Sequence, residues 1–343
     1  MRGLRYALLV LPVGGGPSDV RNMENEKTTL VSRLSALIGK RQVARWKKWL
    51  GTVVWKRFDD EKRIVICRMR APKDAPSVLG EAEAVLRKKV WTTWHALLLC
   101  GPDPTTCGPS WILTGEAIGA RLVNVGSVTP LDAITLPAHA TSDAFLAIRA
   151  GEMDKEWSTY GRLGDAWFER WIEIDKLLSA GSLPDILGYA LRSHAKAKCE
   201  PVLDFSMPAF VRATEGVIGL ERNKGGATNF KNRVLMLTPS LNTDPYVGGD
   251  AEKLLLELYE LRNDCVHGKI PFLNLRSQGG AGEERAAKLQ YMAETVAREA
   301  LLVALRFPDQ SVFATREALE KTWSAGRFPP SPPTSVTDIT LRT

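Results

Sequence analysis

The feature of this sequence that most constrains its fold is a change of pattern that follows Pro137 and Ala138. From there to Trp323, segments of helix length succeed one another, each with apolar residues at steps of three and four, the repeat of an amphipathic α-helix. The longest covers residues 283–305, and its apolar seam consists of Leu289, Met292, Val296, Ala300 and Val303. We therefore predict an all-helical bundle over residues 141–324.

Five shorter helices are predicted before the longest one. Their boundaries follow from capping residues and from nearby glycine and proline. The first contains an apolar stripe over residues 157–178. The second begins at 182–185 and the third at 206–208, and the last two cover residues 230–237 and 251–267. Gly268 and Pro271 end the last of these helices.

Residues 1–140 have a mixed pattern. Apolar β-rich runs predict strands at 6–13, 52–55, 63–69, 111–114 and 121–125, and helical spacing predicts helices at 28–38 and 77–94. We therefore expect the α+β class, with an N-terminal mixed α/β sensor or RNA-docking domain over residues 1–140 and the helical domain after it. The Pro-rich tail at 325–343 has too little apolar content to pack, which predicts disorder.

Composition excludes several classes of protein. No apolar run is long enough for a membrane span, so we expect no membrane partner. The five cysteines form no C-x-x-C pair, which favours a reducing cytoplasm and structural thiols over a zinc site. The chain has no P-loop and no G-x-G-x-x-G that opens a helix. We therefore predict neither a metal nor a cofactor.

A basic segment with interleaved tryptophans lies at residues 40–57 and carries as many cations as the net charge of +7. The side chains that we assign to RNA binding are Lys40, Arg41, Arg45, Trp46, Lys47, Lys48, Lys56 and Arg57. Cations can neutralise phosphates while exposed indoles stack on unpaired bases. The alternative is a solvated face whose tryptophans are buried, and the sequence favours neither reading.

The polar end of the helix predicted at 251–267 carries the candidate chemistry, in Arg262, Asn263 and His267. Arginine offers a planar fork for phosphate, and histidine is the side chain whose ordinary pKa lies nearest neutral pH. On an ideal helix Arg262 and His267 are roughly 140° apart. They meet only if His267 stands on the exit turn before Gly268, or if the arginine comes from a second subunit. The alternative is a capped helix end without chemistry.

Residues 258–269, LYELRNDCVHGK, resemble the signature of HEPN proteins, in which an arginine is followed by a polar residue and then by a histidine. The similarity in detail is to the HEPN domains of bacterial abortive-infection proteins. In those domains, segments similar to FVRATEGVI at 210–218 and FKNRVL at 230–235 precede the Tyr-x-x-Arg-Asn helix in the same order. The resemblance covers residues 154–305 of this chain.

The resemblance implies a metal-independent endoribonuclease, usually a homodimer, that acts on RNA as a toxin or an anti-phage defence effector and can have a neutralising or activating partner protein. It implies that His267 activates the ribose 2′-hydroxyl or protonates the leaving oxygen. Arg262 is implied to hold the scissile phosphate and Asn263 to orient Arg262, with a 2′,3′-cyclic phosphate and a 5′-hydroxyl as products. Some HEPN domains only bind nucleotides or partners. A catalytically silent interaction or dimerisation module, or a nucleic-acid-binding regulator, therefore stays open as the alternative.

Three further side chains, Glu215, Arg233 and Tyr259, are predicted to support this site. Glu215 falls on an apolar stripe, where an unpaired carboxylate is costly, so we expect it to meet Arg262 or Arg233. Such a pair is either a support of the active site or a plain internal ion pair. Tyr259 is more typical of core packing than of a site.

Overall fold

The computed structural model describes residues 4–11, 23–25, 28–31, 43–44, 47–48, 52, 63–70, 92, 95–96, 98–99, 110–114, 119–123, 133–137, 165–181, 183–200, 202–220, 226–241, 243, 250–326 and 328. The chain packs as two units, Met1–Ser179 and Ala180–Thr343. The predicted domain boundary after residue 140 lies outside the described residues. So do most of the helix predicted at 77–94 and the tail from residue 329 onward.

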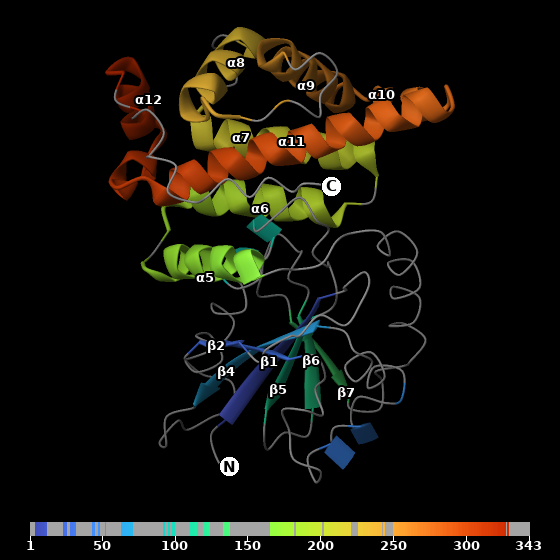
Figure 1. Ribbon diagram of the computed structural model, residues 1–343, viewed down its shortest axis with the longest axis vertical. Helices are drawn as coiled ribbons and strands as arrows, with labels where there is room; N and C mark the ends of the chain where they lie inside the picture. The colour runs from blue at the N-terminus through green and yellow to red at the C-terminus, as the bar shows by residue number, and fades with distance from the viewer. Residues whose placement is uncertain are drawn as a thin grey trace. The chain divides into compact units, whose positions relative to one another are not determined.

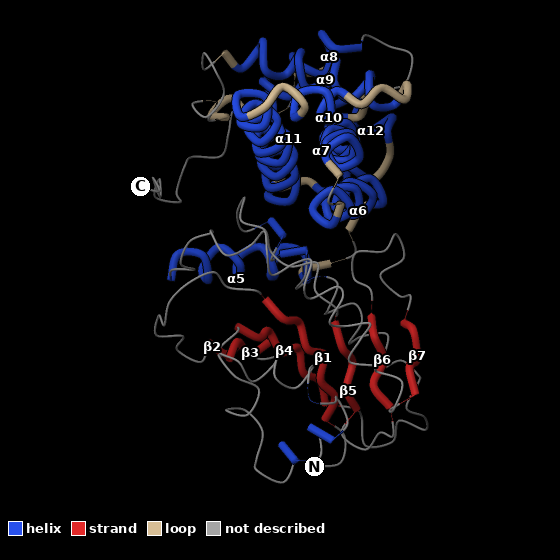
Figure 2. Tube along the Cα trace, turned by 90° about the vertical axis from the view of Figure 1, so that its right-hand side faces the viewer, coloured by secondary structure: helices blue, strands red, loops and turns tan. Residues whose placement is uncertain are grey.

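The strands of the first unit form one antiparallel sheet in the order β2-β3-β4-β1-β5-β6-β7 (Figures 1 and 2). Their bounds are β1 Leu4–Leu11, β2 Met23–Asn25, β3 Thr28–Val31, β4 Arg63–Arg70, β5 Ser110–Thr114, β6 Gly119–Val123 and β7 Ala133–Pro137. β1 lies in the middle and pairs with β4 and β5, with Tyr6 opposite Arg68 and Leu113. Its nearly continuous apolar sequence LRYALLVL is consistent with a strand.

The predicted α+β class, with a mixed α/β N-terminal domain, is corrected by the structure. Of the residues described with their side chains, 81% are helical and none lies in a strand. The strands are described by their backbone, and the helix predicted at 28–38 begins as β3, because the β-rich run Thr28–Val31 pairs with β4. Thr52, predicted in a strand, is helical, and β2 and β7 were not predicted.

The last described element of the first unit is α5, Asp165–Ser179. It buries Trp171, Ile174 and Leu178, which lie on the apolar stripe predicted for residues 157–178. The part of that stripe before Asp165 lies outside the described residues.

The second unit is helical throughout its described part. Its elements are α6 Asp185–Cys199, α7 Leu203–Ile218, α8 Gly226–Leu237, α9 Ala251–Val266, α10 Pro271–Arg276, α11 Gly280–Arg306, the 3-10 helix η1 Gln310–Phe313 and α12 Arg316–Ser324. α7 is the central helix, because it packs on α6, α8, α9, α10 and α11 (Figure 1). None of the helices that the structure describes has both the length and the apolar character of a membrane span.

Capping residues and apolar spacing in the sequence predicted some of the helix boundaries correctly and others not. The helix predicted at 251–267 is confirmed as α9, and the side chain of Asp250 caps it by accepting from the backbone N–H of Lys253. The longest predicted helix is confirmed as α11, although Val303 of its predicted seam is half-buried. α7 begins at Leu203, before the predicted start at 206–208, and contains Pro208 in its second turn.

The early start of α7 has a physical cause in its contact with α10. The carboxylate of Asp204 accepts from the backbone N–H groups of Phe272 and Leu273, at 2.9 and 3.2 Å, and so caps α10. The thiol of Cys265 donates to the same carboxylate at 3.9 Å. The first turn of α7 is therefore anchored to the end of α9 and the beginning of α10, which places the two helices that carry the candidate site.

Phe328, which belongs to the predicted disordered tail, is packed. Its ring stacks on Trp323 with the centroids 3.7 Å apart, and it is 7% exposed. The tail prediction is therefore wrong at this residue.

Candidate active site

α9 ends in a turn that frees the side chain of His267. The backbone N–H of His267 donates to Asn263, that of Gly268 to Cys265 and that of Lys269 to Asp264, and Gly268 has a φ of 80°. The bonds from Gly268 and Lys269 are those of a Schellman motif, which requires a positive φ at its glycine position. His267 is thus the residue that caps the C-terminal end of α9, and it is exposed at the exit of the helix as predicted.

Arg262 is held on three sides. Its Nη2 donates to Oε2 of Glu215 at 3.0 Å, and its Nη1 donates to Oδ1 of Asn263 at 2.9 Å. Its guanidinium lies 5.7 Å from the ring centre of Tyr259. The side chains of Arg262 and Glu215 are 22% and 14% exposed, so the pair is sheltered and still reaches solvent. The expectation that Glu215 meets a cation is confirmed, and the partner is Arg262.

Tyr259 joins this group to the core of the second unit. Its ring centre lies 5.3 Å from that of Phe230, which is fully buried on α8. The ring thus packs on one side and faces Arg262 on the other. Tyr259 supports Arg262 by contact, which agrees with the packing role expected from the sequence.

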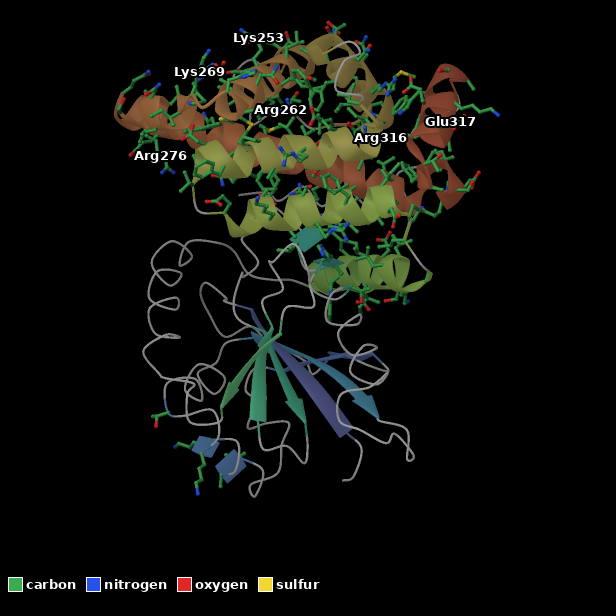
Figure 3. The ribbon with its side chains drawn as sticks, turned by 180° about the vertical axis from the view of Figure 1, so that it is seen from behind. Lys253, Arg262, Lys269, Arg276, Arg316 and Glu317 are labelled. Atoms are coloured by element: carbon green, nitrogen blue, oxygen red, sulfur yellow. The ribbon has the colours of Figure 1, made fainter. Side chains whose placement is uncertain are left out.

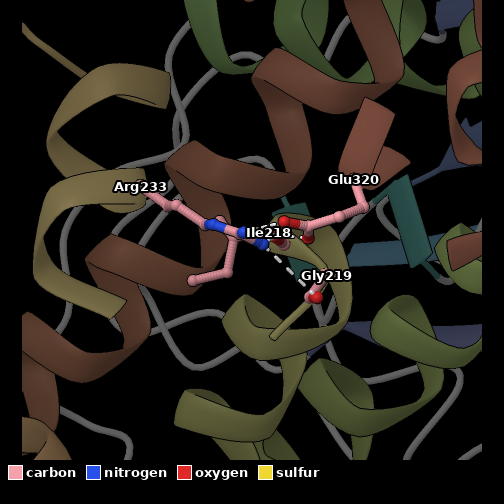
Figure 4. A network of polar contacts seen from close by, with 4 residues as sticks. All are labelled: Ile218, Gly219, Arg233 and Glu320. Atoms are coloured by element: carbon pink, nitrogen blue, oxygen red, sulfur yellow. Dashed lines mark hydrogen bonds and ion pairs between the residues drawn. The ribbon is translucent and has the colours of Figure 1, made fainter. Parts of the chain in front are cut away.

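Arg233 lies elsewhere in the unit (Figure 4). Its Nη1 donates to the carbonyl oxygens of Ile218 and Gly219 at 3.0 and 3.4 Å, and its Nη2 donates to both carboxylate oxygens of Glu320. It also lies over the ring of Trp323, 5.4 Å from the centroid. Arg233 therefore ties α8 to the end of α7 and to α12, and the structure does not bring it to Arg262.

Arg262 and His267 are not brought together within one chain. Glu215, which binds the guanidinium, stands eleven residues after Asp204 on α7, roughly 16 Å along the helix axis. Cys265, two residues before His267, reaches Asp204 instead. The guanidinium is therefore directed along α9, away from the end where His267 leaves the helix.

The Cys265 thiol has no reactive character. Burial, together with the nearby carboxylates of Asp204 and Asp264, raises its pKa to about 12. A thiol with such a pKa is protonated at neutral pH and is a poor nucleophile. Among the residues that the structure describes, no three His, Cys, Asp or Glu side chains are grouped as a metal ion requires.

Only two of the predicted RNA-binding side chains at residues 40–57 are described. Lys47 and Lys48 are both helical and exposed, which fits an RNA-binding face and a solvated face equally well. Lys40, Arg41, Arg45, Trp46, Lys56 and Arg57 lie outside the described residues. The role of this segment stays a prediction.

Two exposed side chains of α7, Phe205 and Arg212, were not singled out from the sequence. Arg212 could have been found from its spacing, because it stands three residues before Glu215 and so shares its side of the helix. Phe205 could not have been found in this way, because the exposure of its side chain depends on which part of α7 the neighbouring helices leave uncovered.

The buried carboxyl of Glu215 predicts a pH dependence of stability. Burial raises its pKa, and the charge and hydrogen bond of Arg262, followed by the charge of Arg212, act against that rise without cancelling it. Since the pKa of Glu215 in the folded state is above its ordinary value of 4.5, the folded state holds this proton more tightly than the unfolded chain does. The stabilisation that protonated Glu215 contributes to the folded state is therefore fully present below pH 4.5, and it is lost as the pH rises through the pKa of the folded state.

We expect the Glu215→Gln variant not to lose stability in this way as the pH rises. Unfolding by urea at a series of pH values measures it, as the difference in unfolding free energy between the wild type and the variant. Below pH 4.5 the two should be close, and the wild type should fall relative to the variant as the pH increases. If the unfolding free energy of the wild type instead rises relative to that of the variant as the pH increases, the attraction between Glu215 and Arg262 outweighs the effect of burial.

Comparisons of the chain with protein-family models, with curated proteins and with solved structures found no match.

Proposed function

We propose that this protein is a metal-independent endoribonuclease of the HEPN type, serving as a toxin or anti-phage defence effector in the cytoplasm. The observation that carries the proposal is the arrangement at the end of α9. Arg262 is fixed by Glu215, Asn263 and Tyr259, while His267 stands exposed on the exit turn. A fixed guanidinium and a free imidazole are the two groups that cleavage of RNA through its own 2′-hydroxyl requires.

The chemistry divides between these side chains. Arg262 uses two of its five N–H groups on Glu215 and Asn263, so others can bind the non-bridging oxygens of a phosphate. His267 takes the proton of the 2′-hydroxyl, or gives one to the leaving 5′-oxygen. The 2′-oxygen then bonds to phosphorus as the bond to the 5′-oxygen breaks. The products are a 2′,3′-cyclic phosphate and a 5′-hydroxyl.

The proposed active form is a homodimer. One chain directs the guanidinium of Arg262 away from its own His267, so a second copy is needed to supply the complementary group. The surface beside His267 is suited to such a contact, because Val266, Ile270 and Leu273 are 52%, 47% and 55% exposed. A neutralising or activating partner protein would act by covering or uncovering this end.

The test is cleavage of RNA by the purified chain in the presence of EDTA, followed by analysis of the new ends. We expect cleavage without added metal and fragments that end in a 2′,3′-cyclic phosphate. RNA with 2′-O-methyl groups should stay intact, because the attacking hydroxyl is blocked. Cleavage that needs a divalent cation, or that leaves 3′-hydroxyl ends, would contradict the proposed mechanism.

A silent interaction module is the second candidate, favoured by the engagement of Arg262 with Glu215 and by the exposed apolar side chains beside His267. The same experiment separates the two. An intact RNA in the presence of a stable dimer would support the interaction module, whereas cleavage excludes it.

A further inference from the structure

Arg212 lies beside the Arg262–Glu215 pair and is not used by the site described above. It stands three residues before Glu215 on the same side of α7, and its charge acts on that carboxyl. Arg212 is exposed and forms no hydrogen bond or ion pair with the described residues. One carboxylate therefore faces two guanidinium groups, and one positive charge stays unmatched at the edge of the candidate site.

Two aromatic rings flank Arg212. Phe205 stands seven residues earlier on α7, about 20° away around the helix and about 10 Å along it, and is 67% exposed. Tyr189 of α6 is 48% exposed and lies at Gly216, one turn after Arg212, where a Cβ would stand 3.8 Å from its Cδ1. The exposed face of α7 thus presents an aromatic ring, a cation and a second aromatic ring in order.

We propose that this face, formed by Phe205, Arg212 and Tyr189, binds the unpaired RNA strand next to Arg262. Arg212 binds a phosphate that flanks the scissile one, and the two rings stack on bases. The inference rests on the proposed function, since it assigns the scissile phosphate to Arg262. It adds a substrate class, single-stranded RNA, because bases within a duplex are not available for stacking on side chains.

The charge and the rings make separate contributions that can be measured apart. A phosphate contact releases counterions, so its loss lowers the dependence of binding on salt, by about 0.7 in the slope of log K against log salt for a single strand. At 0.1 M salt the same term corresponds to about a fivefold change in affinity. Stacking on an aromatic ring is insensitive to the strand's sequence and adds affinity without that dependence on salt.

The experiment measures binding of an unstructured RNA oligonucleotide to the full chain carrying His267→Ala, at several salt concentrations. Adding Arg212→Ala should weaken binding about fivefold at 0.1 M salt and flatten the salt slope by about 0.7, whereas Arg212→Lys should keep the slope. Phe205→Ala should weaken binding about fivefold or more and leave the slope unchanged.

Matched controls are Arg316→Ala and Tyr291→Ala, which remove an exposed arginine from α12 and an exposed tyrosine from α11 (Figure 3 labels Arg316 and Arg262). Both should bind RNA as the parent does. The inference is overturned if the controls weaken binding as much as Arg212→Ala, if the salt slope is unchanged, if duplex RNA binds equally well or if the oligonucleotide does not bind. It is also overturned if the α7 variants alter self-association and not RNA binding, which would mark a protein interface.

Cleavage by the otherwise wild-type chain separates this inference from the proposed function. If RNA is cut and Arg212→Ala changes neither KM nor the salt slope, the strand-binding face fails alone. If no RNA is cut but Arg212→Ala flattens the salt slope, the proposed ribonuclease fails and the strand-binding face stands.

Discussion

His267→Ala is expected to lower the rate of RNA cleavage by about 10²–10⁴-fold, the usual contribution of a side chain that transfers a proton. The fold should be unaffected. The turn at the end of α9 is made by backbone N–H groups of residues 267, 268 and 269 and by the positive φ of Gly268, none of which involves the imidazole. The rate is measured on a labelled RNA, and circular dichroism follows the helix content.

Lys269→Ala is the matched control for this substitution. Lys269 lies on the same turn and is exposed, and it pairs with Asp264 at the surface, where ion pairs contribute little (Figure 3). It should retain the wild-type rate. If His267→Ala cleaves RNA at the wild-type rate, the imidazole has no role in proton transfer. If Lys269→Ala is as slow as His267→Ala, the loss comes from a change in the turn and not from the imidazole.

Arg262→Ala alone is a poorer test than His267→Ala. It leaves Glu215, a carboxylate whose side chain is 14% exposed, without its ion-pair partner, so a loss of activity could follow from a loss of structure. The double variant Arg262→Ala with Glu215→Gln removes the charge of both partners. If that variant keeps its helix content and has lost cleavage, the loss belongs to the guanidinium and not to unfolding.

Local signals in the sequence were sufficient for the helix ends that position the candidate site. Asp250 and Gly268 act through backbone hydrogen bonds within a few residues of the chain, so α9 could be bounded without knowledge of its neighbours. The need of Glu215 for a cation also follows from a local pattern, because a carboxylate on an apolar stripe is costly wherever the stripe packs.

Partners that are distant in the sequence could not be chosen in the same way. Glu215 had two candidate arginines, and only the packing of α7 against α9 and α8 selects Arg262 and sends Arg233 to Glu320. The start of α7 depends on the capping of α10 by Asp204, 68 residues away. The strand at Thr28–Val31 depends likewise on its pairing with β4.

The interior of the second unit contains a cluster of charges formed by Glu294, Lys198 and Arg298. Oε1 of Glu294 lies 2.5 Å from Nζ of Lys198 and 3.6 Å from Nη1 of Arg298. The three side chains are 9%, 5% and 6% exposed. The Glu294 carboxylate on α11 thus pairs with a lysine from α6 and with Arg298, one turn further along α11, and Nε of Arg298 also lies 3.4 Å from Oε1 of Glu299.

Glu294→Ala should destabilise the protein by about 3–5 kcal/mol, the usual effect of removing one partner from a buried ion pair. The loss comes mainly from Lys198, which stays buried without this carboxylate, and less from Arg298, which keeps its contact with Glu299. Urea unfolding followed by circular dichroism measures it, and we expect the midpoint to fall by roughly 1–2 M for a chain of this size.

Glu284→Ala is the control for this substitution, because it also removes a glutamate of α11 that pairs with a lysine. Glu284 is 67% exposed and its partner Lys288 is 40% exposed, so water can replace the interaction and the midpoint should hardly change. Equal shifts for the two variants would mean that helix propensity, and not burial, decides the effect. A large shift for Glu294→Ala alone would show that the contact between α6 and α11 is held by this charge cluster as well as by the apolar seam of α11.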